Sequence, residues 1–426
     1  MDRPNILYLH SHDTGRYIQP YGHAVATPRL QRLAEEGVLF RQNFSVAPTC
    51  SPSRAALLTG SYPHENGMRG LAHLGYSLND YKQHIIHTLR GEGYVSALAG
   101  IQHIAGAEAE EEAWRIIGYD TCLEGGQFER QAAAFLEGAP TTPFFLDVGF
   151  FETHREFPPL QDTFENPNYC LPPSPLPDTP ETREDTARYK ASARELDRKM
   201  GVVLDALERS GLAENTMVIC TTDHGIAFPR MKCNLYDSGI GTMLIIRGPG
   251  GFAGGKVIDC MTSHLDIFPT ICDLLQIEPP PWLRGKSLLP LVSQETPELH
   301  DELFFEINDH AAYEAVRAVR TGRWKYIRRI DEHRTPVLLN CDNGESKSLW
   351  LNHDWEHQPV PEESLYDLVF DPNEKDNLAG QAASQEILTA MRGCLMRWME
   401  STNDSLLDDF MRSLPDVDSE PTSGVL

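Results

Sequence analysis

Short apolar runs alternate with amphipathic segments over roughly the first three hundred residues, and this alternation most constrains the fold. Apolar runs bounded by turn residues are typical of buried strands, and the longer periodic segments between them are typical of helices. Strands that alternate with helices pack as a largely parallel sheet covered by helices. We therefore predict a mixed, largely parallel α/β fold, with strands over 5–10, 94–100, 143–150, 217–222 and 243–248.

Two segments between these strands carry start and stop signals of helices. One begins at Pro28, with Thr27 as its N-cap, and ends at Gly37. The other spans 188–211 and follows a proline-rich stretch, 169–181, that we predict to be a loop. Both segments have the length expected of helices that cover a sheet.

The character of the sequence changes after about residue 300. The stretch "AVRAVRTGRWKYIRR" predicts two strands joined by a Thr-Gly turn, and an amphipathic helix is expected over about 383–400. We therefore predict two units. The main α/β domain covers 1–305, and a smaller C-terminal α+β subdomain, with an antiparallel sheet and a helix, covers 306–426.

The charge balance excludes two broad classes of partner. The chain has 426 residues and a formal net charge of -25. Nucleic acids and anionic membranes require a basic face, so neither is expected as a partner. The start of the chain, "MDRPNILYLHSHD", enters a strand without a charged leader, and no apolar run approaches the length of a membrane span. With nine cysteines and no Cys-x-x-Cys spacing, we expect a cytoplasmic, reducing environment.

Four of the predicted strands are followed by side chains that perform chemistry. In an open parallel sheet, sites form in the crevice beyond the carboxyl ends of the strands. A single histidine after a strand is usually a loop residue, but four strands with the same feature favour a shared site. The residues concerned are His12, Asp13, His103, His154, Asp223 and His224.

The stretch "PTCSPSRAALLTG", residues 48–60, adds a reactive side chain to this set. We predict a helix that starts at Pro52, with Ser51 as its N-cap, and stops at Gly60. Cys50 would then lie just ahead of the helix N-terminus, where unpaired N–H groups and the helix dipole bind anions and lower the pKa of a thiol. Arg54, one turn into the helix, can point back to the same place. These features predict an anion site.

The same stretch resembles the signature of the type I sulfatases, formylglycine-dependent members of the alkaline phosphatase-like superfamily. "NILYLHSHD" is similar to their first metal-binding strand, "TTDHG" to the second, and "LYDLVFDPNEKDNLA" (365–379) to their C-terminal signature. The pattern "HENGMRGL" is closest to heparan N-sulfatase-like members. The resemblance implies one divalent metal ion held by His12, Asp13, Asp223 and His224, together with the modified side chain at Cys50.

The resemblance also implies that a dedicated maturation enzyme, which would be a partner of this chain, oxidises Cys50 to formylglycine. One hydroxyl of the hydrated aldehyde attacks sulfur and releases the alcohol or amine, and the other then expels sulfate. Arg54 would steady the hydrate, and His103 would be the general base for sulfate elimination. His154 and Lys232 would bind sulfate and protonate the leaving group.

Two positions depart from the family pattern. Ile101 stands where the family usually has a lysine, so one cation expected on the sulfate is missing. Either another cation, such as Arg155, replaces it, or the substrate carries less charge. His12 stands where the family has an aspartate. Calcium prefers oxygen ligands, whereas imidazole suits Mn²⁺ or Zn²⁺. We favour Ca²⁺ on family grounds, with Mn²⁺, Mg²⁺ and Zn²⁺ as alternatives.

These observations predict a sulfatase that cleaves a sulfate ester or sulfamate on a small or terminal sugar-like substrate. The small substrate is expected because a net charge of -25 repels heavily sulfated polymers. The alternative is a phosphonate monoester or phosphodiester hydrolase, whose monoanionic substrate tolerates the loss of the lysine at Ile101. A non-catalytic relative that keeps the fold for binding is a third class. The residues give no signal for the oligomeric state.

Overall fold

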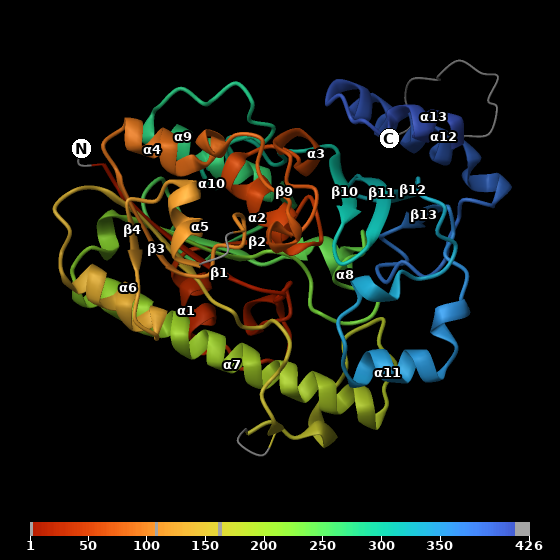
Figure 1. Ribbon diagram of the computed structural model, residues 1–426, viewed down its shortest axis with the longest axis horizontal. Helices are drawn as coiled ribbons and strands as arrows, with labels where there is room; N and C mark the ends of the chain where they lie inside the picture. The colour runs from red at the N-terminus through yellow and green to blue at the C-terminus, as the bar shows by residue number, and fades with distance from the viewer. Residues whose placement is uncertain (1–2, 107–109, 161–163, 414–426) are drawn as a thin grey trace.

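The computed structural model describes residues 3–106, 110–160 and 164–413, and its core is a large mixed sheet (Figure 1). Within the described residues this sheet has nine strands. Five strand pairs are parallel and three are antiparallel. Strand β9 (Lys256–Ser263) pairs with β2, and the other strands follow the order β4 (Thr121–Leu123), β3 (Val95–Gly100), β5 (Phe144–Gly149), β1 (Asn5–Ser11), β6 (Thr216–Thr222), β8 (Leu244–Arg247), β2 (Val38–Phe44) and β7 (Gly241–Thr242).

Helices cover both faces of the sheet because successive side chains of each strand point to opposite faces. Along β1, Ile6 and Tyr8 pack into one apolar core, and Leu7 and Leu9 pack into the other. Figure 1 shows the two helical layers above and below the strands. One layer contains α2 (Cys50–Thr59), α4 (Ile85–Gly91), α5 (Glu110–Ile117), α9 (Ile267–Leu275) and α10 (Leu289–Val292), and the other contains α1 (Pro28–Glu36), α6 (Phe128–Glu137) and α7 (Pro180–Arg209).

The predicted fold class is confirmed, and the five predicted strands correspond to β1, β3, β5, β6 and β8. Strands β2, β4, β7 and β9 of this sheet were not predicted. In β9, exposed or half-exposed residues run from Lys256 to Cys260, as expected for a strand at the edge of a sheet, so it lacks the continuous apolar run that marks a buried strand.

The structure confirms the start of one predicted helix and moves the start of the other. Helix α1 begins at Pro28 and ends at Glu36, with Gly37 as its C-cap, as predicted. Helix α7 begins at Pro180, eight residues before the predicted 188. The Thr179 hydroxyl accepts a hydrogen bond from the Thr182 N–H and caps this helix, and Pro180 supplies a favourable first-turn residue. The end of the proline-rich stretch is therefore a helix start.

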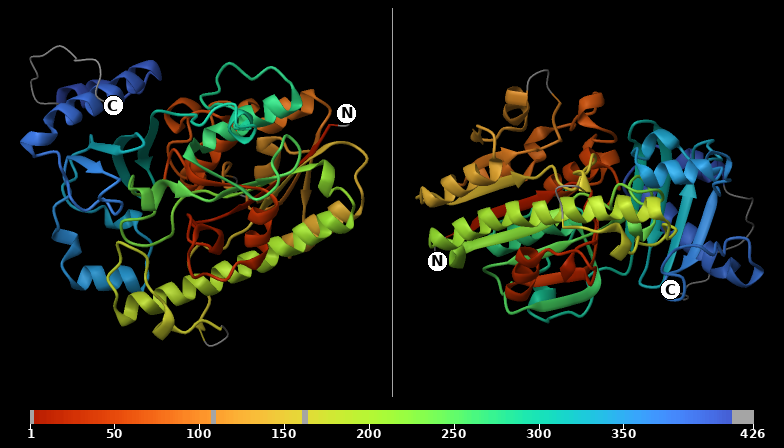
Figure 2. Two further views of the ribbon diagram at one scale, coloured as in Figure 1. Left: turned by 180° about the vertical axis from the view of Figure 1, so that it is seen from behind. Right: turned by 90° about the horizontal axis from the view of Figure 1, so that it is seen from below.

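A second, antiparallel sheet lies beside the end of the central sheet, with α12 (Gln385–Ser401) and α13 (Leu407–Ser413) packed on it (Figure 2). Its strands are β10 (Leu303–Asp309), β11 (Tyr313–Arg320), β12 (Trp324–Arg329) and β13 (Glu363–Asp367). The predicted strand pair and amphipathic helix correspond to β11, β12 and α12. The remaining α-helices of the described residues are α3 (Pro63–Asn66), α8 (Asp237–Ile240) and α11 (Glu345–Asn352), and short 3-10 helices lie in the loops. Residues 414–426 of the predicted C-terminal unit lie outside the described residues.

Among the described residues, no helix combines the length and apolar character that a membrane span requires.

Candidate active site

The residues predicted from the strand ends do lie together. Asp13 and Asp223 follow β1 and β6, and these neighbouring parallel strands bring the Asp13 N–H within 2.8 Å of an Asp223 carboxylate oxygen. His12 lies between His103, which follows β3, and His154, which follows β5; its ring centroid is 5.8 Å from each of theirs. The carboxyl ends of four strands therefore form one buried cluster, as parallel packing requires.

The start of helix α2 differs from the prediction by two residues. The helix begins at Cys50 with Thr49 as its N-cap, so Cys50 is the first helical residue. Ser51 is inside the first turn, and its hydroxyl accepts a hydrogen bond from the Ala72 N–H at 3.0 Å. Gly60 ends the helix with a left-handed φ of 71°, as predicted.

The environment of Cys50 also corrects the predicted pKa of its thiol. The side chain is 1% exposed, and burial raises the thiol pKa well above its usual range. The cations Lys232 and Arg54 do not offset burial, and the carboxylates Asp223 and Asp13 add to the rise. The prediction that the helix N-terminus lowers this pKa is therefore wrong, because desolvation outweighs the helix dipole here.

The donor set around Cys50 suits a divalent cation. Ligand atoms of His12, Asp13, Cys50 and Asp223 all lie within 4.8 Å of one another. His12 Nδ1 lies 3.4 Å from Asp223 Oδ2, but neither buried ring nitrogen makes a hydrogen bond, which is costly for a polar group unless it has a ligand. The His224 ring is held by a 3.0 Å contact from Nδ1 to the Gly225 carbonyl, and its Nε2 lies 3.3 Å from Cys50 Sγ. Two carboxylates and two imidazoles thus face position 50.

Arg54 is held by three acceptors from two strand ends. Its Nη2 donates to the Ser11 carbonyl and to Asp223 Oδ2, both at 2.9 Å, and its Nη1 donates to His10 Nδ1. Because a guanidinium only donates, His10 Nδ1 must accept, and its Nε2–H donates to Asp147 Oδ1 at 2.7 Å. This buried Asp147–His10–Arg54–Asp223 chain was not predicted. The polar His10 and Asp147 within strand segments were the available signals.

Lys232 joins the site to the C-terminal part of the chain. Its ammonium lies 2.9 Å from Asp13 Oδ2 and 3.2 Å from Asp342 Oδ2. Burial lowers the pKa of Lys232, but Asp13 and other neighbours raise it well above the usual range, so it carries a proton. Burial raises the pKa of Asp342, but Lys232, His154 and His310 lower it to about 2, so it is ionised. Asp342 and His310 lie far from the motifs and were not predicted.

Three further histidines, His73, His103 and His154, are less buried and form the outer part of the site. Burial, followed by Arg54, lowers the pKa of His103 to about 3, so this side chain is neutral. His103 Nε2 lies 3.3 Å from Nδ1 of His73, and their rings stack at 5.5 Å. The His154 Nδ1 lies 2.5 Å from the Arg155 carbonyl, so this nitrogen donates and Nε2 is left to accept.

Arg155 does not supply the cation missing at Ile101. Its guanidinium makes two hydrogen bonds of 2.8 Å to Asp185 of α7 and donates to the Ala227 carbonyl at 2.8 Å. Its charge is therefore balanced by Asp185 outside the cluster. The idea that Arg155 takes over the role of the lysine is not supported by this geometry.

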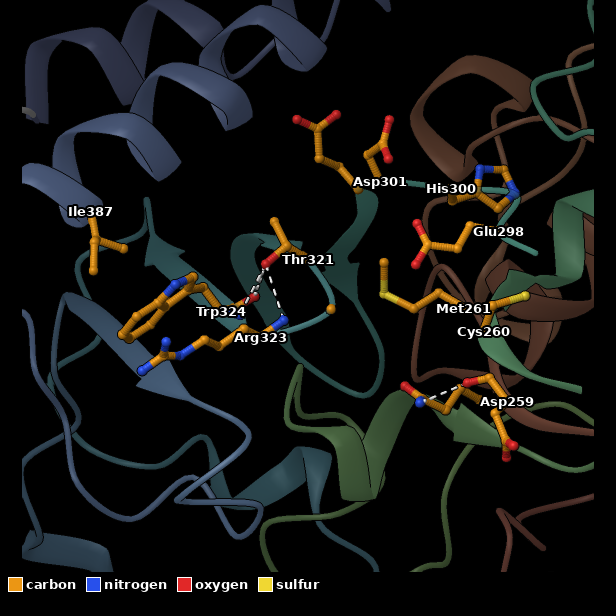
Figure 3. A pocket seen from close by; sticks show the side chains of 13 residues that line it. Asp259, Cys260, Met261, Glu298, His300, Asp301, Thr321, Arg323, Trp324 and Ile387 are labelled. Carbon is orange, nitrogen blue, oxygen red and sulfur yellow. Dashed lines mark hydrogen bonds between the residues drawn. The ribbon is translucent and has the colours of Figure 1, made fainter. Parts of the chain in front are cut away.

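A cavity of about 910 Å³ lies apart from this cluster, between the two sheets (Figure 3). It is lined by Asp259, Glu298, Asp301, Arg323 and Trp324 among others. None of the predicted site residues lines it. Its carboxylates make it acidic, so it does not suit a sulfated substrate.

Comparisons with known proteins agree with the geometry. The "Sulfatase" family model matches residues 4–277, and the model described as "N-sulphoglucosamine sulphohydrolase, C-terminal" matches residues 224–360. An ulvan-active sulfatase of Formosa agariphila is 30% identical over 95% of this chain and 76% of its own. The N-sulphoglucosamine sulphohydrolase of Homo sapiens is 28% identical over 94% of this chain and 90% of its own.

Solved structures share the fold. The structure of BT4656 in complex with its substrate D-glucosamine-2-N,6-O-disulfate has a TM-score of 0.74 at 19% identity and covers 96% of this chain and 99% of its own. A phosphonate monoester hydrolase of Silicibacter pomeroyi has a TM-score of 0.74 at 20% identity, covering 95% and 97%. The fold is that of the alkaline phosphatase-like class. Within that class, the chain belongs to the sulfatase family and is a sulfuric ester hydrolase.

Proposed function

We propose that this chain hydrolyses a sulfate ester or a sulfamate on a small or terminal amino-sugar or related sugar substrate. The observation that carries the proposal is the buried cluster of His12, Asp13, Cys50 and Asp223, whose ligand atoms lie within 4.8 Å of one another. Sugar substrates are named for the similar proteins, ulvan for one and a glucosamine disulfate for another. The acidic chain supports an end-acting enzyme, because long sulfated polymers are repelled.

We infer the roles of the side chains from the family resemblance, and their contacts support them. Asp13, Asp223, His12 and His224 would hold a divalent cation against a formylglycine formed from Cys50. The cation would supply positive charge beside position 50, and a formylglycine formed there would supply a hydroxyl nucleophile for sulfur. His12 introduces nitrogen into this set, so the balance between Ca²⁺ and a metal such as Mn²⁺ depends on whether its imidazole is a ligand.

The other residues of the cluster would bind the substrate and move protons. The Arg54 guanidinium keeps Asp223 in place and adds positive charge beside position 50. The Lys232 ammonium would bind a sulfate oxygen. His103 is neutral and able to accept the proton that leaves position 50 when sulfate is expelled. His154 Nε2 would exchange a proton with the leaving group, since its Nδ1 is already bound.

The test is a comparison of Cys50→Ala with the matched variant Cys260→Ala, which removes a half-buried thiol outside the cluster. Cys50→Ala should abolish hydrolysis of 4-nitrophenyl sulfate with little change in Tm, whereas Cys260→Ala should keep it. The mass of tryptic peptide 42–54 shows whether the aldehyde is present. Full activity of Cys50→Ala would contradict the formylglycine mechanism.

Ile101 favours a second candidate, a phosphonate monoester or phosphodiester hydrolase. The family cation is missing at that position, and Arg155 is bound to Asp185, so the site suits a monoanion, such as a phosphonate monoester or phosphodiester, better than a phosphate monoester dianion. The phosphonate monoester hydrolase noted above shares the fold alone. Rates on 4-nitrophenyl sulfate and a 4-nitrophenyl phosphonate monoester separate the two. A far faster phosphonate reaction would overturn the sulfatase proposal.

A further inference from the structure

A second cavity, of about 400 Å³, lies on the face of the antiparallel sheet that α12 does not cover. Helix α12 packs on Val319, Tyr326 and Leu365, and side chains at alternate positions of the same strands point to the other face. Each of the four strands lines the cavity with a residue of that other face: Ile307, Val316, Ile327 and Ser364. The volume is within the range of small-ligand sites, about 300–1,000 Å³.

Aromatic side chains form the walls of this cavity. The rings of Trp350 and Trp355 meet edge to face with centroids 5.4 Å apart, and those of Tyr236 and Tyr366 meet at 6.1 Å. The Arg230 guanidinium lies 4.6 Å from the centroid of the Tyr236 ring, so this wall also carries a positive charge. The negative face of an aromatic ring attracts the C–H groups of a sugar ring, so these walls suit a sugar.

The cavity offers hydrogen-bond donors that have no partner. Arg329 is 8% exposed, and its Nε–H is buried without a partner, as is the Nε1–H of Trp350. Among the described residues that line the cavity, Glu314 supplies the one carboxylate. Its two oxygens already accept from Arg329 Nη2 at 2.6 Å and from Asn340 Nδ2 at 2.9 Å. A buried donor without a partner is unfavourable, so a ligand of this cavity must bring acceptors.

The lining is positively charged in an acidic protein. It carries three cations, Arg230, Arg329 and Lys375, against the carboxylate of Glu314, whereas the whole chain has a net charge of -25. Arg230 Nη2 donates to the Glu374 carbonyl at 3.2 Å, and no carboxylate pairs with its guanidinium among the described residues. Positive charge, donors and aromatic walls together fit an acidic sugar, whose carboxylate or sulfate accepts charge-assisted hydrogen bonds.

The cavity shares a wall with the candidate active site. Cys233 lines the cavity, and the residue before it, Lys232, extends its ammonium to Asp13 Oδ2 at 2.9 Å. Consecutive residues, with Cα atoms about 3.8 Å apart, therefore face the two sides of this wall. The Cys233 N–H also donates to the Pro48 carbonyl at 2.9 Å, which joins the wall to the segment that leads into Cys50.

The C-terminal part of the chain builds the wall in the same way. Cys341 lines the cavity, and the next residue, Asp342, lies 3.2 Å from the Lys232 ammonium. The Asp342 side chain keeps 20% of its surface exposed, so the edge of the wall is open to solvent. A saccharide that lies across this edge can place one unit at the candidate active site and its neighbour in the cavity.

We propose that this cavity is a subsite for an acidic sugar unit of the substrate, next to the unit that carries the scissile sulfate. The inference rests on the proposed function and extends it from a sulfated sugar to a saccharide with an acidic neighbouring unit. Arg230 pairs with the carboxylate or sulfate of that unit, and Trp350 packs on its ring and donates from Nε1. Both are specificity-determining residues, because neither touches the reacting atoms.

Binding of glucuronic acid tests the subsite without turnover. In an NMR titration, glucuronic acid should bind the wild-type protein more tightly than glucose, and Arg230→Gln should weaken it about tenfold, as expected for one charge-assisted hydrogen bond. Glucose 6-sulfate in the same titration distinguishes a sulfate from a carboxylate as the acidic group. Trp350→Phe, which keeps an aromatic wall and removes the Nε1 donor, should weaken binding less.

Arg323→Gln is the matched control for these titrations. That arginine also lies over an aromatic ring, Trp324, but it lines the separate cavity of Figure 3. Its replacement should leave the binding of glucuronic acid unchanged. No binding of either acidic sugar to the wild-type protein, or equal binding by wild type and Arg230→Gln, would overturn the inference.

The kinetic test uses glucosamine N,6-disulfate joined to glucuronate, and the same unit joined to glucose. Arg230→Gln should raise KM about tenfold for the glucuronate disaccharide and leave its kcat unchanged. Both constants for 4-nitrophenyl sulfate should stay the same, because that substrate does not reach the cavity. KM values that change equally for the two disaccharides would overturn the inference. Hydrolysis of neither disaccharide by a protein that binds glucuronic acid through Arg230 would contradict the proposed function and not the acidic-sugar site.

Discussion

Replacement of Arg54 by glutamine should cost both stability and activity, because this residue neutralises a buried carboxylate. Arg54 and Asp223 are 2% and 3% exposed, and Arg54 Nη2 lies 2.9 Å from Asp223 Oδ2. Two unit charges about 4 Å apart attract by about 4 kcal/mol at an effective dielectric constant of about 20. Removing one partner of a buried pair destabilises a protein by about 3–5 kcal/mol. We expect a loss of this size in the metal-free protein.

A divalent cation should recover part of that loss. The cation would place positive charge beside Asp223, so the difference in Tm between Arg54→Gln and wild type should shrink when metal is added. Activity should remain low, with kcat reduced about 10²–10³-fold, the usual cost of removing one group that stabilises transition-state charge. Arg209→Gln, which changes an exposed arginine of α7, controls for the loss of a surface charge.

The assays are thermal unfolding in EDTA and in excess metal, and hydrolysis of 4-nitrophenyl sulfate. A cycle with Asp223→Asn isolates the pair, since the double variant should be less destabilised than the sum of the single ones. Additive effects, or an Arg54→Gln enzyme as stable as wild type in EDTA, would refute the claim that Arg54 offsets the buried charge of Asp223.

The other predictions concern the metal, pH and substrate size. His12→Asp should raise the affinity for Ca²⁺ relative to Mn²⁺, because it replaces a nitrogen ligand by an oxygen ligand. Calorimetry on metal-stripped protein measures both affinities, and an unchanged preference would mean that His12 is not a ligand. Burial lowers the pKa of His64, but the Glu306 carboxylate, which lies 2.8 Å from His64 Nδ1, raises this pKa above its usual value of about 6.5. This pair therefore stabilises the fold below about pH 6.5, and the contribution is lost as pH rises through the folded-state pKa. As the pH rises from about 6 to about 9, the free energy of unfolding in urea should fall more for the wild type than for His64→Gln. Equal slopes for the two proteins would contradict this. Sulfated monosaccharides or chain ends should be hydrolysed faster than the interior of long sulfated chains, and the reverse order would contradict the expected small substrate.

Local patterns in the sequence determined the fold class and most of the cluster that would hold the metal. The apolar runs of β1 and β6 needed no tertiary information, because a fully buried strand is apolar along its whole length. Parallel strands bring their carboxyl ends to one edge, so Asp13 and Asp223 could be placed together from the sequence. The resemblance around Cys50 then assigned the class of chemistry.

The tertiary structure decided the charges and partners of those residues. The pKa of the Cys50 thiol depends on burial and on carboxylates from other segments, and these outweigh the helix N-terminus that the sequence shows. Arg155 is adjacent to His154 in sequence, yet its guanidinium is bound to Asp185 of α7. Asp342 reaches Lys232 from a loop 110 positions further along the chain. Such contacts arise when distant segments pack, and no local pattern encodes which buried charge will meet which partner.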